Sequence, residues 1–258
     1  MISIIIVSLN TKDDFLKTLN SIISQTEEVE VIGVDGGSTD GTTMEIKKNS
    51  KFFNKIIIEK DEGIYFAMNK GIKQASKEWI YFLNSGDIFY NDKTIKNIIE
   101  ILKIYKKSDV VIGNSLVKRN NNIVTSKRSK IDDNTVNSCF SHQSTFTKRY
   151  LLEMYPFDTE FKYASDFNFF LKLFKLGKKF IYIDNFISIN KYGGISDLNR
   201  IKVFLEFRKI TMRENKNLVN LLKINLLILF NFFKKIIKIT LPNLVIEKII
   251  FLSKKNNN

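Results

Sequence analysis

Apolar positions follow two different rhythms along the first 105 residues. Four strand-like runs cover residues 2–9, 29–35, 55–59 and 79–83, and the first of them is a continuous apolar run suited to a parallel strand buried on both faces. Apolar residues at helical spacing mark the segments between and after these runs, at residues 15–23, 39–48, 64–75 and 94–105. This alternation predicts an α/β fold with an open, mostly parallel sheet and helices on both faces. Ligands bind beyond the carboxyl ends of the strands in such sheets, so the turns after the four runs are the candidate sites.

The pattern is less regular in the second half of the chain. A strand region with a polar hairpin tip, two helices and a further strand are expected at residues 110–125, 148–154, 165–176 and 180–183. Beyond about residue 197 the sequence is helical and rich in Lys and Ile. This change in composition predicts a boundary between a domain at residues 1–197 and a helical, basic tail at residues 198–258.

The composition is that of a globular protein, with 258 residues of which 44% are hydrophobic and 26% are charged. The single cysteine, Cys139, cannot form an internal disulfide, and no Cys/His cluster has the spacing of a zinc site. These features favour a reducing, cytoplasmic compartment. The apolar run at residues 2–9 has no basic residues before it, so we expect a first strand there rather than a signal peptide.

The formal net charge of +14 raises the question of an anionic partner. We expect no nucleic acid in this role, because the sequence contains no helix-turn-helix signature, zinc finger or RNA-binding aromatic motif. An anionic membrane surface or a phosphate-bearing substrate accounts better for the charge.

Polar residues gather in three of the four candidate turns. Asp35 ends the second run and leads into a Gly-Gly-Ser-Thr-Asp-Gly turn, Asp61 follows the third, and Asn84-Ser-Gly-Asp87 follows the fourth. A carboxylate at a strand end can accept hydrogen bonds from a base or ribose, and glycines let the backbone approach a ligand closely. A carboxylate can also hold a divalent cation that bridges two phosphates. The alternatives are a helix N-cap for the first turn and an ordinary tight turn for the last.

Taken in order, residues 34–42, 61–71 and 82–87 resemble the family 2 glycosyltransferases, and most closely their surface-polysaccharide (colanic-acid-type) branch. The resemblance covers about residues 1–197 and implies the GT-A fold, with a Rossmann-like nucleotide-binding part at about 1–112 and an acceptor side at about 113–197. It also implies an inverting mechanism and a divalent cation, Mn²⁺ or Mg²⁺. By this similarity the metal ligand is Asp87, and the nucleotide-sugar is bound by Ser8, Asp35, Asp61, Asn69, Lys70, Asn84 and Ser85.

Two positions depart from the family pattern. Asn84 stands where the family commonly has an acid, which leaves Asp87 as the one carboxylate of this turn and predicts weaker metal binding. Phe66 occupies a place that is often Asp in this branch, so no polar role is expected there.

The resemblance also implies a catalytic base. The segment at residues 156–166 resembles the family stretch that ends in an acid at a helix start, so Asp166 is the expected base, with Asp158 as the alternative. Ser165 is expected to cap this helix, whose first-turn amides favour an ionised carboxylate. His142 and Gly194 belong to segments that resemble stretches lining the site in the family, although a lone histidine is commonly a packing residue.

A basic helix is expected at residues 218–241. Its apolar residues surround most of the circumference, and Asn225 is out of place among them. One narrow polar face contains Asn220, Lys223, Asn231, Lys234, Lys235 and Lys238. The lysines interrupt the apolar run before it reaches the roughly 20 residues of a membrane span. The pattern favours a helix lying on an anionic membrane surface, and packing on the domain or on another subunit is the alternative.

The sequence thus predicts an inverting transferase that moves a hexosyl or N-acetylhexosaminyl group from a nucleotide-diphosphate sugar to a hydroxyl. A lipid-linked glycan in surface polysaccharide, lipopolysaccharide or capsule synthesis is the expected acceptor. We expect the protein to lie at the cytoplasmic, inner face of the cell membrane. One alternative is a nucleotidyltransferase, but residues 9–13 lack the glycine-rich basic loop that such an enzyme needs. The other is a non-catalytic scaffold on the membrane surface that keeps the fold.

Overall fold

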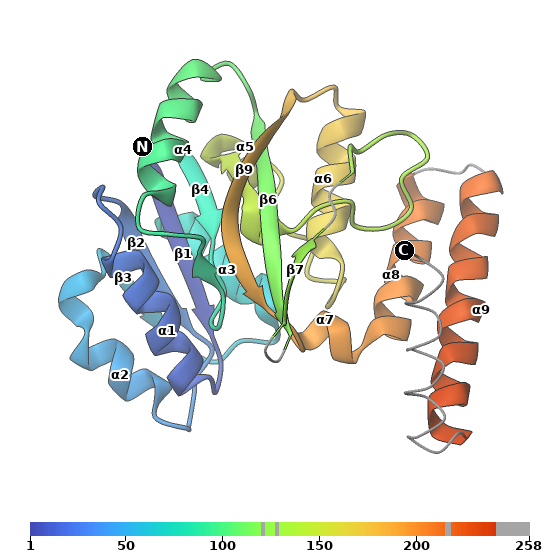
Figure 1. Cartoon of the computed structure of the whole chain (residues 1–258), viewed down its shortest axis with the longest axis horizontal. Helices are drawn as coiled ribbons and strands as arrows, with labels where there is room; N and C mark the ends of the chain where they lie inside the picture. Colours follow the sequence, from blue (N-terminus) through green and yellow to red (C-terminus); the bar gives the residue numbers. More distant parts are fainter. Residues whose placement is uncertain (120–121, 127–128, 215–217, 241–258) are drawn as a thin grey trace.

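The computed structural model describes residues 1–119, 122–126, 129–214 and 218–240. The described strands form one mixed sheet in the order β3-β2-β1-β4-β8-β6-β9-β5, with β7 paired to β6 (Figure 1). This architecture confirms the expected α/β fold with a mostly parallel arrangement in its first half.

The first half of the sheet is parallel. Its strands are β1 (Ile2–Ser8), β2 (Glu30–Asp35), β3 (Lys55–Ile58) and β4 (Trp79–Phe82). β1, β2 and β4 lie in the core, whereas β3 is a partly exposed edge strand. Every residue of β1 is buried, because its two faces point into separate apolar clusters. Ser8 and Asp35 are paired in the register of β1 and β2, which places the expected nucleotide residues at one edge of the sheet.

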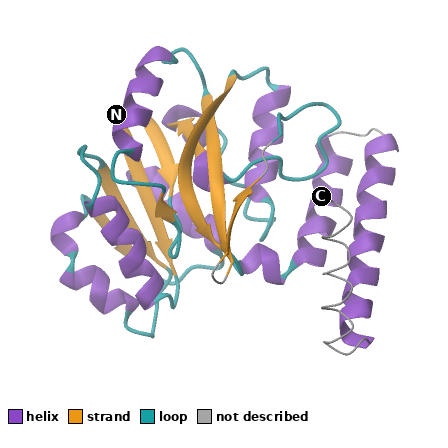
Figure 2. Cartoon of the chain, in the orientation of Figure 1, coloured by secondary structure: helices purple, strands orange, loops and turns teal. Residues whose placement is uncertain are grey.

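Helices cover the sheet on both faces (Figure 2). One face packs against α1 (Lys12–Ile23), α2 (Thr42–Lys48) and α4 (Thr94–Ile104). The other face packs against α3 (Ile64–Gln74), α5 (Arg149–Met154), α6 (Ser165–Lys175) and α8 (Arg200–Glu214). The turn η1 (Ser50–Phe52) leads from α2 to β3. Gly71 of α3 lies so close to β1 that a Cβ atom there would be 2.5 Å from Ile5 Cγ2.

The second half of the sheet is built differently. It contains β5 (Ile88–Phe89), β6 (Val110–Arg119), β7 (Asn122–Ser126), β8 (Thr145–Lys148) and β9 (Phe180–Lys191). β8 is antiparallel to both β4 and β6, whereas β9 is parallel to β6. The strand expected at residues 180–183 continues to Lys191, past an irregular register next to Gly113. The short helix η2 (His142–Ser144) directly precedes β8, and the short helix α7 (Ile195–Leu198) directly follows β9.

The helix α8 belongs to the same core as the residues before 197. Val203, Phe204, Phe207 and Ile210 are buried in the cluster that also contains the apolar residues of α6. The helix α9 (Leu218–Thr240) lies beside α8 in an antiparallel pair (Figure 1). The expected tail therefore begins with a helix that packs tightly on the domain.

The expected polar face of the last helix is wrong for its first turns. Asn220 is fully buried and donates to the Asp133 main-chain oxygen (2.8 Å), and Asn225, the residue that seemed out of place, accepts from Arg208 Nε (2.9 Å). Both amides therefore face the protein: Asn220 meets the loop that contains Asp133, and Asn225 meets α8. Lys223 and Lys234 are exposed, while the side chains of Lys235 and Lys238 and the chain after residue 240 lie outside the described residues. Among the helices described, none is long and apolar enough to cross a membrane.

Candidate active site

The carboxylate of Asp35 organises the turn that follows β2. Asp35 is fully buried and accepts hydrogen bonds from the Ser38 main-chain N–H (3.1 Å), the Ser8 hydroxyl (3.3 Å) and the hydroxyls of Ser38 and Thr43. Asp40 in turn accepts from the N–H groups of Thr42 and Lys12. The turn is thus fixed by its own acids, and Ser8 and Asp35 lie side by side at the carboxyl ends of β1 and β2.

Asp61 lies against this turn from the end of β3. Its side chain is only 4% exposed and pairs with Lys70 Nζ at 2.5 Å. A Cβ atom on Gly36 would lie 3.4 Å from Asp61 Oδ2, so the two turns touch. Four of the predicted nucleotide-binding residues, Ser8, Asp35, Asp61 and Lys70, are therefore gathered at one edge of the sheet.

Asn69 binds the main chain of a distant segment, whereas its neighbour Lys70 pairs with Asp61. Its amide donates to the Phe157 main-chain oxygen (2.8 Å) and accepts from the Phe157 N–H (3.0 Å). The side chain therefore joins α3 to the segment that leads to α6, and both of its polar ends are occupied. Phe66, the position of α3 that departs from the family pattern, is half-buried.

The turn after β4 contains a buried acid beside two unpartnered oxygens. Asp87 is 5% exposed; its carboxylate accepts from the Lys191 N–H (2.9 Å) and from Gln143 Nε2 (3.1 Å). Burial raises the pKa of Asp87 to about 6, against the opposing effect of these hydrogen bonds. The amide oxygen of Asn84 and the hydroxyl of Ser85 are buried without a hydrogen-bond partner.

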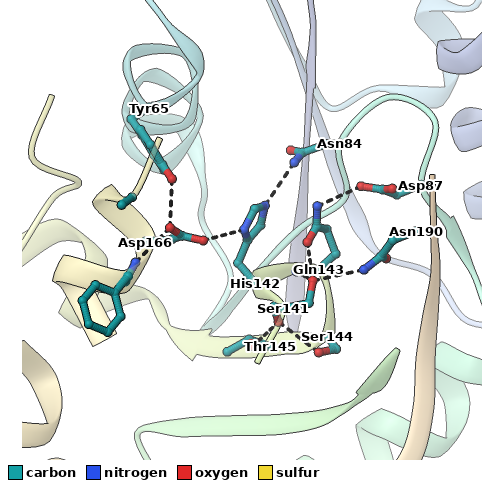
Figure 3. A network of polar contacts seen from close by, with 12 residues as sticks. Tyr65, Asn84, Asp87, Ser141, His142, Gln143, Ser144, Thr145, Asp166 and Asn190 are labelled. Carbon is teal, nitrogen blue, oxygen red and sulfur yellow. Dashed lines mark hydrogen bonds and ion pairs between the residues drawn. The ribbon is translucent and has the colours of Figure 1, made fainter. Parts of the chain in front are cut away.

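Asp166 is the centre of a second polar network, shown in Figure 3. One carboxylate oxygen accepts from the Tyr65 hydroxyl (2.9 Å) and the Phe167 N–H (2.8 Å), and the other lies 2.9 Å from His142 Nδ1. Burial acts to raise the pKa of Asp166, but the interactions with His142, Tyr65 and Phe167 outweigh it, so this pKa lies below its usual value. Asp166 is therefore an ionised carboxylate at neutral pH.

His142 connects this network to the turn after β4. Its Nε2 lies 3.0 Å from Asn84 Nδ2, so the contacts are satisfied when Nδ1 carries the proton, which it donates to Asp166, and Nε2 accepts from Asn84. The next residue, Gln143, reaches Asp87. The segment at residues 142–143 thus bridges the expected base and the expected metal ligand (Figure 3).

Tyr65 is a member of the Asp166 network that the sequence analysis missed. It is buried on the apolar side of α3, where its ring packs on Phe157 at 5.3 Å between centroids. Only its hydroxyl is polar, and that hydroxyl meets Asp166 from a position 101 residues away in the chain. The available signal was its place in the Glu-Gly-Ile-Tyr stretch directly after Asp61.

The expected cap of α6 is wrong. The N-cap residue is Ala164, and the hydroxyl of Ser165 has no hydrogen-bond partner. The turn before the helix is held instead by the carboxylate of Glu206, which accepts from the N–H groups of Lys162, Tyr163 and Ala164.

Two further predicted positions lie away from the Asp166 network. Asp158, the alternative base, is paired with Arg213 at 3.0 Å. Gly194 is exposed at the start of α7, and nothing lies within 4 Å of the place that a Cβ atom would take.

The donor atoms of the Asn84–Asp87 turn suit a divalent cation that is shared with a ligand. One carboxylate, one amide oxygen and one hydroxyl are hard oxygen ligands, and Mg²⁺ commonly takes one or two carboxylates together with substrate phosphates. Within the described part of the chain no group of three or more His, Cys, Asp or Glu residues could hold a metal by itself. The unpartnered oxygens of Asn84 and Ser85 beside Asp87 therefore fit a cation that phosphate oxygens complete.

Comparison with known proteins defines the family. Residues 3–186 match Glycosyl transferase family 2, so the chain belongs to this family. A PGL/p-HBAD biosynthesis glycosyltransferase of Mycobacterium bovis (strain BCG / Pasteur 1173P2) is 29% identical over 228 residues, which cover 85% of this chain and 88% of the relative. An uncharacterized glycosyltransferase of Mycobacterium tuberculosis (strain CDC 1551 / Oshkosh) is 33% identical over 103 residues, or 39% of each chain.

Solved structures share the fold at low sequence identity. Staphylococcus aureus TarS 1-349 in complex with UDP-GlcNAc has a TM-score of 0.65 at 19% identity, and the match covers 88% of this chain and 71% of that one. In another structure of TarS 1-349 the match covers 66% of that chain. The mannosyltransferase PcManGT from Pyrobaculum calidifontis, in complex with GDP-Man and Mn²⁺, has a TM-score of 0.65 at 20% identity, with 87% of this chain and 68% of that one covered. The fold is therefore GT-A-like, as the resemblance implied.

Proposed function

We propose that this chain transfers a sugar from a nucleotide-diphosphate sugar to an acceptor hydroxyl with inversion at the sugar carbon, and that Asp166 is the general base. The observation that carries this proposal is the network of Asp166, His142 and Asn84, which links an ionised carboxylate to the turn at the end of β4. A base on one side of a phosphate-binding turn is the arrangement that an in-line displacement needs.

The donor site in this proposal is the carboxyl edge of the parallel strands. Ser8, Asp35 and Asp61 bind the nucleoside, and Lys70 holds Asp61 in place through their ion pair. Asn69 is a positioning residue, because its amide is already bound to Phe157. The complexes of the structural neighbours with UDP-GlcNAc and with GDP-Man and Mn²⁺ support a nucleotide-sugar donor.

Asp87, Asn84 and Ser85 are the residues that would hold a divalent cation. Such a cation would neutralise charge on the diphosphate leaving group. The residues of this chain do the remaining work. Asp166 accepts the proton of the acceptor hydroxyl, while Tyr65 and His142 hold its two oxygens in one orientation.

The test of this proposal is an Asp166→Asn variant compared with Asp158→Asn. We expect Asp166→Asn to lower turnover of the best donor among UDP-GlcNAc, UDP-glucose and GDP-mannose by about 100-fold or more, with donor affinity nearly unchanged. Asp158→Asn removes the alternative base, and we expect it to cost far less turnover. Near-normal turnover of Asp166→Asn would refute the role of Asp166, and absence of turnover in the unaltered protein with every donor would favour a scaffold.

The acceptor in this proposal is a lipid-linked glycan of surface polysaccharide synthesis at the inner face of the cell membrane. The supporting observation is the outer face of α9, a set of exposed apolar side chains that consists of Leu218, Val219, Leu222, Leu226, Leu229, Phe230 and Phe233. Leu218 is 74% exposed and Phe230 is 62% exposed, which is costly in water. Helical geometry puts the exposed Lys223 and Lys234 along one border of this face, where they meet anionic headgroups.

Substitutions on this face test membrane binding better than deletion of the helix does. Removing α9 would uncover Ile224 and remove the contact of Asn225 with Arg208 of α8, whereas Leu222→Ser/Leu226→Ser/Phe230→Ser changes only exposed side chains. We expect the unaltered chain to sediment with vesicles that contain anionic lipid, less so at high salt, and the triple variant to stay in the supernatant.

A matched triple variant at exposed apolar residues elsewhere is the control. Met44→Ser/Ile104→Ser/Met154→Ser alters side chains that are 60–74% exposed on other elements, and it should sediment like the unaltered chain. No vesicle binding together with a concentration-dependent dimer that the first triple variant abolishes would assign the face to a second copy of the chain and contradict the membrane proposal.

A further inference from the structure

One carboxylate of α8 holds the backbone turn directly before the base. Glu206 Oε1 accepts from the Lys162 N–H (2.9 Å), and Oε2 accepts from the N–H groups of Tyr163 (2.8 Å) and Ala164 (2.9 Å). Three successive N–H groups that point to one anion form a compact anion-binding turn. Ala164 is the N-cap of α6, and Asp166 is two residues further along the chain.

The sequence offers a local capping group for the start of this helix, but the structure does not use it. Ser165 is fully buried at the start of α6, and its hydroxyl has no hydrogen-bond partner. A carboxylate makes stronger hydrogen bonds to N–H groups than a hydroxyl does. The start of the helix is therefore set by a residue that is more than 40 positions away in the chain.

Other contacts of α8 fix the residues that follow Asp166. The ring of Phe207 packs against that of Phe167 at 4.9 Å between centroids. Arg213 Nη2 donates to Asn168 Oδ1 at 3.1 Å, and Arg213 Nη1 pairs with Asp158 at 3.0 Å. The helix α8 thus contacts the chain on both sides of Asp166, whereas the side chains that bind the Asp166 carboxylate are Tyr65 and His142.

We propose that Glu206 is a positioning residue for the base: by holding the turn at residues 162–164, it fixes the start of α6 and so the place of the Asp166 carboxylate. This inference rests on the proposed role of Asp166. The distances of 2.9 Å from Asp166 to Tyr65 Oη and to His142 Nδ1 can both be kept only if the helix starts at a defined place. A displacement of about 1 Å at a catalytic group can cost on the order of 100-fold in rate.

The variant that tests this is Glu206→Gln, which keeps the shape of the side chain but replaces one accepting oxygen with an amide NH₂ group. We expect turnover of the best donor among UDP-GlcNAc, UDP-glucose and GDP-mannose to fall by about 10- to 100-fold, with the donor KM changed by less than about twofold. Glu206→Asp, which keeps the charge, should recover part of the loss. Glu214→Gln is the matched control, because Glu214 is on the same helix and binds Arg213 rather than the turn.

A double-mutant cycle separates positioning from general stabilisation. If Glu206 acts through Asp166, Glu206→Gln should have almost no further effect on turnover in the Asp166→Asn background. Full additivity of the two losses would overturn the inference, and so would unchanged turnover of Glu206→Gln. If Glu206→Gln does not fold, the same cycle with Glu206→Asp decides. Failure of the proposed function looks different, because Asp166→Asn alone would then keep its turnover.

Discussion

The bond between Asn69 and Phe157 allows a sharp test of how the two halves of the site are joined. The Asn69 amide makes two hydrogen bonds to Phe157. Its NH₂ group donates to the Phe157 main-chain oxygen (2.8 Å), and its oxygen accepts from the Phe157 N–H (3.0 Å). Phe157 is 3% exposed, so water cannot easily replace the lost partner in Asn69→Ala. Each hydrogen bond contributes about 0.5–1.5 kcal/mol net, and a buried group left without a partner costs about 1–3 kcal/mol.

From these values we expect Asn69→Ala to lower the free energy of unfolding by about 2–4 kcal/mol. Urea denaturation followed by circular dichroism measures this loss as a fall in the midpoint at an unchanged slope. The control is Lys73→Ala, an exposed position of the same helix, which should stay within about 0.5 kcal/mol of the unaltered protein.

The same variant also distinguishes a positioning role from donor binding. Because the Asn69 amide is occupied by Phe157, the affinity of the folded variant for the nucleotide-sugar, measured by calorimetry, should change by less than about twofold. An unfolding free energy within about 0.5 kcal/mol of normal, combined with a tenfold loss of donor affinity, would refute this reasoning and return Asn69 to the donor site.

Three further predictions concern the metal and the packing. The pKa of Asp87 is about 6, and a cation needs the ionised carboxylate. In a calorimetric titration with saturating nucleotide-sugar, the apparent Mn²⁺ affinity should therefore fall about tenfold from pH 7 to pH 5. The Asp87→Asn variant should show weak, pH-independent Mn²⁺ binding in the same titration. Asn84→Asp should lower the Mn²⁺ concentration that gives half-maximal activity. It should also reduce turnover, because it removes the donor to His142 Nε2. Full activity of the unaltered protein in EDTA would contradict a metal role. Gly71→Ala should cost about 1–3 kcal/mol of stability by its clash with Ile5, while Gly194→Ala, with open space around it, should cost almost nothing by thermal denaturation.

Local patterns were enough for the parallel half of the sheet. Strands such as β1 are apolar throughout because both of their faces are covered, and this leaves a continuous run in the sequence. The order of strands and helices then places the turns at residues 36–41 and 84–87 at the carboxyl edge without any knowledge of distant contacts. The expected gathering of Ser8, Asp35 and Asp61 follows from topology alone.

Contacts between distant segments were beyond the reach of those patterns. The strand β9 carries Asp184 and Asn185 in its middle, so its apolar run looks finished at residue 183, although pairing with β6 continues to Lys191. Tyr65 looks like one more apolar position of α3, since only its hydroxyl reaches Asp166. Nothing near Glu206 in the sequence indicates that its partners lie more than 40 residues earlier.

The two acids of the site, Asp87 and Asp166, have opposite pKa shifts because their surroundings differ. Asp87 is buried and Asp166 is half-buried, with 16% of its side chain exposed, and desolvation acts to raise the pKa of each. Asp166 has a histidine, a phenol and a main-chain N–H that together stabilise its charge and hold its pKa below the usual value. Asp87 has one main-chain N–H and one amide, which do not outweigh burial, so its pKa is raised, and a bound cation would stabilise the charged form. In the proposed mechanism, a base that must be ionised before the acceptor binds and a ligand that becomes charged together with its metal need opposite pKa shifts, and the two carboxylates have such shifts.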